Sequence, residues 1–198
     1  NSPRVGAPVD KSNDISAMSE FASEPSENKE DSRPLNERLV SKKWKDRKAA
    51  YEELKGLFDS GSKEAFSEYQ GFLEGCAKDK FQACVADGFA ACKAFFLNNK
   101  DFKDDENSVK MAILRSAMEG FKQKTTTVKE ADELALVLFQ TAQAHPAGLD
   151  EMVEALMGAK GVKNRNIKIS SQSVVTLKHA VEKFGVPSIP LAHVIAGL

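Results

Sequence analysis

The sequence is poor in the residues that hold small disulfide-bonded or metal-binding domains together. It has three cysteines, Cys76, Cys84 and Cys92, an odd number with no C-x-x-C motif. This argues against a disulfide framework and against a zinc site. Cys84 and Cys92 are eight residues apart on one face of an expected helix, among apolar neighbours, so we predict buried and inert thiols.

Motifs for catalysis and for cofactor binding are also missing. The three histidines are scattered without metal-ligand spacing, and there is no glycine-rich phosphate loop and no Ser-His-Asp arrangement. We therefore expect no enzymatic activity, no metal and no cofactor. Because no apolar run is long enough to cross a bilayer and no signal-peptide pattern opens the sequence, we expect a soluble intracellular protein with no membrane association.

The chain also lacks a strong charge of either sign. Its formal net charge is -1, which gives no global signal for nucleic acid or for an acidic partner. Residues 1–33 are rich in Ser, Pro, Asn, Glu and Asp and have few large apolar side chains. Such a segment cannot bury enough surface to offset its ordering entropy, so we predict a disordered acidic, polar linker followed by one folded domain over residues 34–198.

Strand signals are absent from residues 34–198, whereas helical stripes run throughout. The clearest joins Ala50, Tyr51, Leu54, Leu57 and Phe58 at the spacing of an amphipathic helix. A shorter helix before it is expected to carry Leu35, Leu39 and Val40 on one face. Further helices are expected at about 63–77, 81–97, 109–123, 131–139, 149–157 and 167–184, and one more starts at about residue 190.

Two details of these helices are predicted from single residues. Thr127, with Glu130 three positions later, forms a capping-box pattern at the start of a helix. In the helix at 167–184 we expect Val174, Leu177 and Val181 to face inward, with Gly185 ending the helix.

The helices form a helix-turn-helix unit that repeats about every 40 residues. Four full pairs and the beginning of a fifth predict an all-α, HEAT-like solenoid, in which neighbouring pairs stack into one core. A compact helical bundle is the alternative that periodicity alone leaves open.

The turns inside the four pairs are basic. They contain, in order, Lys42, Lys43 and Lys45; Lys78 and Lys80; Lys122, Lys124 and Lys129; and Lys160, Lys163, Arg165 and Lys168. In a stacked solenoid these turns line up along one edge of the slab. A nearly neutral protein would then carry one basic ridge suited to an acidic partner.

The first turn also contains the only tryptophan, Trp44. A tryptophan in a lysine-rich turn has two interpretations. Its ring either folds back over the first helix pair, or it is a contact anchor that offers large area at little cost in rotamer entropy.

The stretch PLNERLVSKKWKDRKAAYEELKGLF, residues 34–58, resembles the opening of a TOG domain, the tubulin-binding module of microtubule polymerases and their relatives. The matching residues are Leu35, Arg38, Lys42, Trp44, Lys45, Arg47, Ala50, Tyr51 and Glu52. The segment KNRNIKISSQSVVTLKHAVEKFG, residues 163–185, is similar to the family's fourth repeat, with Ile167 where a proline is usual. The final IPLAHVIAGL resembles the start of the fifth repeat, so the resemblance covers roughly residues 34–198.

The resemblance implies a flat TOG-type paddle of HEAT repeats whose intra-repeat turns grip the αβ-tubulin heterodimer. The tubulin-binding residues expected from it and from the basic turns are Trp44, Lys45, Lys80, Phe81, Thr126, Thr127, Lys129, Lys163, Arg165 and Lys168. It also implies a monomeric module of a longer multidomain microtubule-associated protein, with this chain ending before a fifth turn. The expected location is the cytoplasm, on microtubules, the spindle or a microtubule-organising centre.

Two other functions remain open at this point. One is a HEAT-type scaffold or adaptor for a different acidic protein, and the other is a helical-repeat binder of nucleic acid. Trp44 in a turn favours tubulin over the scaffold. The near-neutral charge and the lack of several aromatic residues along the ridge argue against nucleic acid, since stacking on bases normally needs them.

Overall fold

The structure is a computed structural model that describes residues 32–104, 107–143 and 146–189. Within these ranges it is helical and contains no strand. The helices of the described ranges all belong to one compact unit, Arg33–Leu198. The predicted disordered linker lies outside the described residues except for its last two positions, and so does the helix expected from residue 190.

The helices pair as the repeat predicts. The first pair is α1 (Leu35–Leu39) and α2 (Trp44–Asp59). The second joins α3 (Lys63–Tyr69), the 3-10 turn η1 (Gln70–Phe72) and α4 (Leu73–Ala77) to α5 (Gln82–Asn98). The third is α6 (Ser108–Gly120) and α7 (Thr125–Ala142), and the fourth is α8 (Pro146–Met157) and α9 (Ile167–Phe184), followed by the 3-10 turn η2 (Val186–Ser188).

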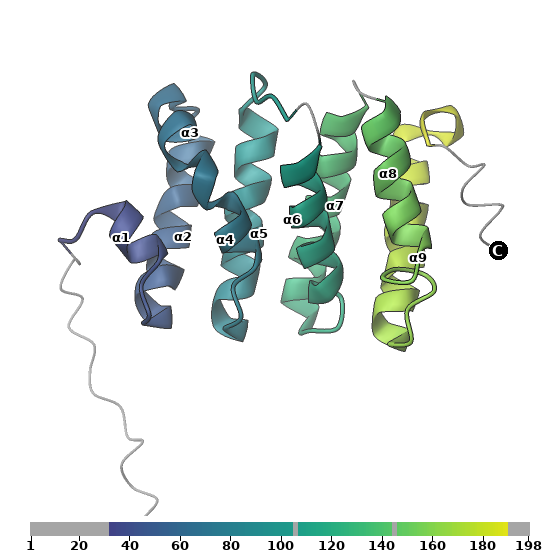
Figure 1. The fold of residues 1–198 in the computed structure, drawn as a ribbon, viewed down its shortest axis with the longest axis horizontal. Helices are drawn as coiled ribbons and strands as arrows, with labels where there is room; N and C mark the ends of the chain where they lie inside the picture. The colour runs from purple at the N-terminus through teal and green to yellow at the C-terminus, as the bar shows by residue number, and fades with distance from the viewer. Residues whose placement is uncertain (1–31, 105–106, 144–145, 190–198) are drawn as a thin grey trace, which may run out of the picture. The chain divides into compact units, whose positions relative to one another are not determined.

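The pairs stack side by side in two layers (Figure 1). Helices α2, α5, α7 and α9 pack in sequence in one layer, and α4, α6 and α8 pack in sequence in the other. The all-α HEAT-like solenoid is confirmed, because each pair covers its apolar face with the next pair.

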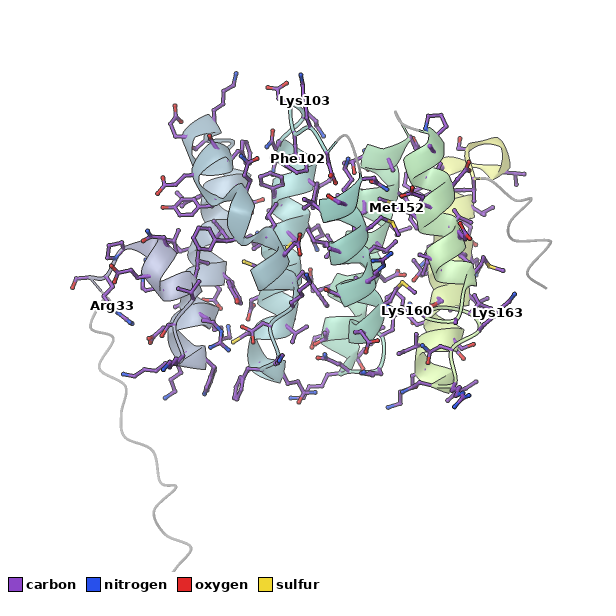
Figure 2. The ribbon with its side chains drawn as sticks, viewed as in Figure 1. Arg33, Phe102, Lys103, Met152, Lys160 and Lys163 are labelled. Carbon is purple, nitrogen blue, oxygen red and sulfur yellow. The ribbon has the colours of Figure 1, made fainter. Side chains whose placement is uncertain are left out.

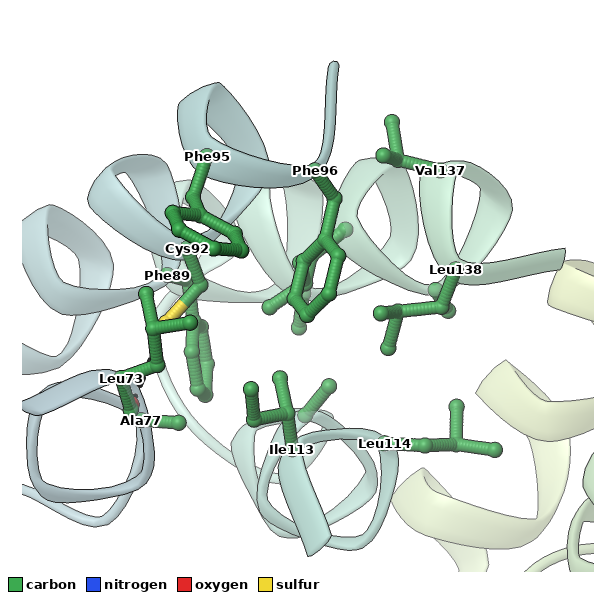
Figure 3. Packing of buried hydrophobic residues seen from close by; sticks show 14 of the residues in the cluster. Leu73, Ala77, Phe89, Cys92, Phe95, Phe96, Ile113, Leu114, Val137 and Leu138 are labelled. Atoms are coloured by element: carbon green, nitrogen blue, oxygen red, sulfur yellow. Dashed lines mark hydrogen bonds between the residues drawn. The ribbon is translucent and has the colours of Figure 1, made fainter. Parts of the chain in front are cut away.

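Aromatic rings fill the core at the junction of the first and second pairs. Phe95 contacts Phe58, Phe66 and Phe96 with ring centroids 5.1–5.5 Å apart, all edge to face. Figure 3 shows how Phe95 and Phe96 of α5 continue into the aliphatic packing of Ile113 and Leu138 from the third pair. Edge-to-face pairs stabilise such a core beyond the area that they bury.

The three cysteines are free and buried, as predicted. Burial raises the pKa of Cys76 to about 12, and it also raises the pKa of Cys84 and of Cys92. The Cys84 thiol donates to the carbonyl oxygen of Trp44 at 3.2 Å, and the Cys92 thiol donates to that of Leu73 at 3.3 Å. Because the thiolate is the reactive form of cysteine, thiols with raised pKa values are unreactive, and their role here is structural.

In the native protein at pH 7.5 we expect all three thiols to react with a disulfide reagent at least about a hundredfold more slowly than in denaturant. A pKa well above neutrality leaves little thiolate, and the fold excludes the reagent. Absorbance of the released thiolate, with and without guanidinium, measures both rates. Rapid native labelling of even one cysteine would contradict this.

Several predicted details of the helices are wrong. Val40 is 68% exposed, because α1 ends at Leu39 and Val40 leaves the helical face. The single helix expected at 63–77 is broken by η1, which contains Gly71, a residue of low helix propensity. Val174 is 51% exposed, because α9 buries the polar residues Ser173 and Thr176 instead.

The capping box at Thr127 is also wrong. Helix α7 begins two residues earlier, at Thr125, with Lys124 as its N-cap and no side-chain cap. Thr127 therefore lies inside the first turn of α7 and is buried, and Glu130 pairs with Lys93 of α5 at 2.7 Å. The end of α9 at Gly185 is confirmed, with φ of 83° and its N–H donated to the carbonyl oxygen of Val181.

Candidate protein-binding edge

The four intra-repeat turns lie along one edge of the slab, the lower edge in Figure 1. We call it the turn edge and define it as residues 41–45, 78–81, 121–126 and 158–168. The segments that join one pair to the next, 59–64 and 98–104, lie on the opposite edge, which we call the inter-repeat edge. The arrangement follows from the stacking of antiparallel helix pairs, which brings equivalent turns to the same side.

Charge is distributed unevenly between the two edges. The turn edge contains eleven basic residues and one acidic residue, Asp79, whereas the segments 59–64 and 98–104 contain three basic and four acidic residues. The chain is nearly neutral overall, so the turn edge is a localised positive surface. Such a surface steers acidic partners toward it.

Most of these cations are unpaired in the described part of the chain. Lys78 pairs with Glu74, and Lys122 pairs with Glu119. Nine other side chains are exposed and have no carboxylate within 4.0 Å among the described residues: Lys42, Lys43, Lys45, Lys80, Lys124, Lys160, Lys163, Arg165 and Lys168. Figure 2 shows the Lys160 and Lys163 side chains beside the fourth turn.

An aromatic pair joins the first and second turns. The rings of Trp44 and Phe81 are stacked, with centroids 4.8 Å apart and planes inclined by 16°. Trp44 is half-buried against the core, and Phe81 is 43% exposed. Trp44 thus stacks on the neighbouring turn while it also packs against the core, and the stack forms an aromatic platform among the lysines of the turn edge.

Asp79 links the first and second turns through hydrogen bonds beneath the surface. Its carboxylate accepts two bonds from the Arg47 guanidinium, at 2.6 and 3.0 Å, and one from the Tyr51 hydroxyl at 2.9 Å. It also accepts the backbone N–H of Phe81 at 2.8 Å. Arg47 in turn donates to the carbonyl oxygens of Ser41 and Lys42 in the first turn. One ion pair, with a buried carboxylate and a partly buried guanidinium, therefore fixes the backbone on both sides of the aromatic platform.

The electrostatics of this group follow from its contacts. Burial alone would raise the pKa of Asp79, but the hydrogen bonds from Arg47, Phe81 and Tyr51 outweigh burial and hold that pKa below its ordinary value. The same Asp79 carboxylate raises the pKa of Arg47, and burial raises the pKa of Tyr51. Asp79 is thus ionised at neutral pH, and the Arg47 guanidinium balances its charge.

The third and fourth turns present their residues differently from the prediction. Thr126 and Lys129 are exposed, but Thr127 is only 2% exposed, so it is removed from the candidate contact surface. In the fourth turn, a Cβ on Gly161 would lie 1.8 Å from the carbonyl oxygen of Leu156. Only glycine fits this close approach, which shapes the loop that carries Lys163 and Arg165.

The N-terminus of α9 completes the fourth turn. The Asn166 side chain accepts the backbone N–H of Lys168 at 3.0 Å, and the Ser170 hydroxyl donates to the carbonyl oxygen of Val162 at 2.6 Å. The cap engages the backbone of Lys168, which leaves its ammonium exposed.

Sequence reasoning missed the role of Asp79 altogether. It treated Arg47 and Tyr51 as motif and core residues, although both donate to this carboxylate. The available signal was local: an aspartate two residues before Phe81, in a short turn, is a pattern that accepts the backbone N–H two positions later.

The described residues contain no cluster of three or more His, Cys, Asp or Glu side chains that could hold a metal ion. Among the helices of the described ranges, none combines the length and apolar character needed to span a membrane.

Comparison with known proteins gives the family. The model of the TOG domain of the XMAP215/Dis1/CLASP proteins matches residues 30–198. A solved structure, described as the structural basis of tubulin recruitment and assembly by microtubule polymerases with TOG domain arrays, aligns with a TM-score of 0.48 and 12% identity. The alignment covers 81% of this chain and 44% of that chain, so the chain spans less than half the length of the chain that it matches. No curated protein matches the sequence. Because the family model covers most of its length, the chain belongs to the XMAP215/Dis1/CLASP TOG domain family.

Proposed function

We propose that this TOG domain binds the αβ-tubulin heterodimer through its turn edge, as a module of a microtubule-associated protein that regulates microtubule growth. The observation that carries the proposal is the turn edge itself, where exposed unpaired cations surround the Trp44–Phe81 platform. Tubulin is proposed as the partner because the chain belongs to the TOG domain family. The exposed cations and the aromatic platform of the turn edge are the groups proposed to contact it.

The two kinds of residue on the turn edge have different tasks in this proposal. The Trp44–Phe81 platform is the anchor, because buried aromatic residues provide most of the binding energy of protein interfaces. The cations, among them Lys45, Lys80 and Lys168, steer an acidic tubulin surface and fix the register, as charges at the rim of an interface do. Lys163, Arg165, Thr126 and Lys129 extend the same contact along the third and fourth turns.

The proposal describes a binding module with no chemistry of its own. We place it in the cytoplasm, on the microtubule cytoskeleton, as a monomeric domain of a longer protein with residues 34–198 as the domain. A scaffold for a different acidic protein remains the second candidate, since the basic turn edge alone suits any acidic surface.

Co-elution of the chain with purified αβ-tubulin in size-exclusion chromatography tests the proposal. A shift of the chain to the tubulin peak supports it. Failure to co-elute at micromolar concentrations and low salt would leave the scaffold as the function.

Charge reversal at Lys168 is expected to slow association with tubulin on the order of threefold to tenfold at low salt, with little change in dissociation, because a rim charge acts through steering. Raising the salt should shrink the difference, since the screening length falls to about 8 Å at 0.15 M. Stopped-flow or biolayer interferometry measures both rates. The fold should be unaffected, because a glutamate in the first turn of α9 suits the helix dipole.

Lys103→Glu is the matched control. Lys103 is also exposed and unpaired among the described residues, but it lies on the inter-repeat edge (Figure 2). Equal effects of the two reversals would show that only net charge matters and that the turn edge is not the contact.

A further inference from the structure

A groove lies between α6 and α8, in the layer that also contains α4 (Figure 1). Its volume is about 740 Å³. One end of the groove reaches Lys160 of the fourth turn, but the groove is separate from the Trp44–Phe81 platform, which joins the first and second turns. It is therefore a second surface of the domain, distinct from the aromatic end of the turn edge.

The two helices line the groove with facing rows of side chains. Within each row the residues are three, four or one position apart and lie on one face of their helix. The rows are Ser108, Met111, Arg115 and Met118 of α6, and Glu151, Glu154, Ala155 and Gly158 of α8. A groove between two such rows accepts the side-chain ridge of a further helix. From Ser108 to Met118 the axis of α6 rises about 15 Å, which matches a partner helix of about three turns.

The floor of the groove is apolar. Met111 and Met118 of α6 are buried, and the small residues Ala155 and Gly158 of α8 are half-buried opposite them. Methionine side chains adapt their shape to a partner, and such a floor gains free energy when it buries aliphatic groups. An occupant should therefore present an aliphatic stripe to the floor.

The two rims of the groove carry opposite charges. Arg115 is exposed on the α6 side, and Glu151 and Glu154 are exposed on the α8 side. In the described part of the chain Arg115 forms no ion pair within 4.0 Å with either glutamate, so the opposite charges stay apart across the groove. A helix with one acidic and one basic flank can pair with both rims, whereas a helix with two acidic flanks is repelled at the α8 rim.

The groove is less suited to a small molecule. Its volume is within the range of about 300–1,000 Å³ that is usual for small-molecule sites, but such sites enclose most of the ligand and are lined mainly by apolar and aromatic side chains. The residues found to line this groove include no aromatic side chain, and the groove is open to solvent between charged rims. These features favour a chain segment as the occupant.

We propose that this groove binds an amphipathic helical segment of another protein, with an aliphatic stripe between an acidic flank and a basic flank. Arg115 pairs with the acidic flank, and Glu151 and Glu154 pair with the basic flank. The inference rests on the groove alone and does not depend on the proposed tubulin function.

The test is an NMR titration of the full chain with a blocked helical peptide of about three to four turns, with leucines in one stripe, glutamates on one flank and lysines on the other. A scrambled peptide of the same composition and a peptide with glutamates on both flanks are the other arms. We expect saturable shifts of the Arg115, Ala155 and Gly158 amides with the first peptide, and at least about tenfold weaker binding of the other two.

Three outcomes would overturn the proposal. They are the absence of saturable shifts, equal binding of the scrambled peptide, and shifts of the same amides when the chain alone is concentrated. The last outcome would assign the groove to a second copy of this chain.

Glu154→Lys reverses one charge of the α8 rim. We expect it to bind the mixed-charge peptide about threefold to tenfold more weakly than the parent chain does, and the peptide with two acidic flanks more tightly. Glu182→Lys is the matched control, because Glu182 is an exposed carboxylate on α9 and is not among the groove residues. Equal effects of the two variants would show that only net charge matters. Tubulin takes no part in this readout, so a failure to bind tubulin would leave the peptide result standing.

Discussion

Asp79→Ala is expected to lower the free energy of unfolding by roughly 2–4 kcal/mol, because it removes a buried carboxylate and leaves the partly buried Arg47 guanidinium without its anionic partner. The Asp79 side chain is only 2% exposed and holds Arg47 through two bonds. Its loss also leaves the Tyr51 hydroxyl and the backbone N–H of Phe81 without their acceptor. Chemical denaturation followed by circular dichroism measures the change.

Asp59→Ala is the matched control. Asp59 is a half-exposed carboxylate that pairs with Lys55 one helical turn away, and such pairs contribute little. We expect its substitution to change the free energy of unfolding by no more than about 0.5 kcal/mol. Similar costs for the two variants would show that the Asp79 ion pair does not stabilise the fold.

The dependence on pH follows from the lowered pKa of Asp79. A carboxyl whose pKa is depressed in the folded state contributes stability above its unfolded pKa and loses it as the pH falls through the folded pKa. The difference in stability between the parent chain and Asp79→Ala should therefore be full at neutral pH and should shrink below the ordinary value of 3.8. A difference that persists undiminished at pH 2 would contradict this.

Asp79 also illustrates what the sequence could and could not predict. An apolar stripe is formed by residues on successive turns of one helix. The buried face of α2 and the bounds of α9 could therefore be derived from local spacing alone. The pairing of Arg47 with Asp79 spans 32 residues and depends on how the second pair stacks on the first. No local pattern contains that information.

The wrong predictions for Thr127 and Val174 have related causes. Thr127 was expected to cap a helix and to contact a partner. Helix α7 begins two residues before the predicted position, so the Thr127 side chain is buried in the core. Val174 fits an apolar stripe, yet Thr176 is buried because its hydroxyl donates to Asp132 of α7 at 2.5 Å. A polar side chain can be buried when it hydrogen-bonds to a partner in the core. The buried face of the helix then differs from the face that the apolar residues alone predict.

The basic turn edge could be foreseen because it follows from the repeat alone, whereas its aromatic platform could not. Phe81 was expected near the contact only through the family resemblance, and its stacking on Trp44 depends on the backbone that Asp79 fixes. The platform therefore links the stability of the first two pairs to the surface proposed to bind tubulin.

Trp44→Ala is expected to weaken tubulin binding by at least about tenfold, or 1.4 kcal/mol or more, as the loss of an aromatic anchor does. The unfolding free energy should fall by only about 1–2 kcal/mol, well below the 3–5 kcal/mol of a fully buried tryptophan, since the ring is half-buried. The bond from the Cys84 thiol engages the carbonyl oxygen of Trp44 and survives the substitution. Titration with tubulin and denaturant unfolding measure the two effects separately.

Phe81→Ala is the companion variant, and it separates an anchor from a core residue. Trp44 is the only tryptophan, so its emission in the free chain reports on the platform alone. Removing Phe81 should red-shift that emission and make it easier to quench. In a double-mutant cycle the two rings should couple by about 0.5–1.5 kcal/mol in stability, as stacked pairs do. If tubulin binding survives both substitutions while stability falls by 3 kcal/mol or more, the platform is part of the core, and the turn edge binds through its charges alone.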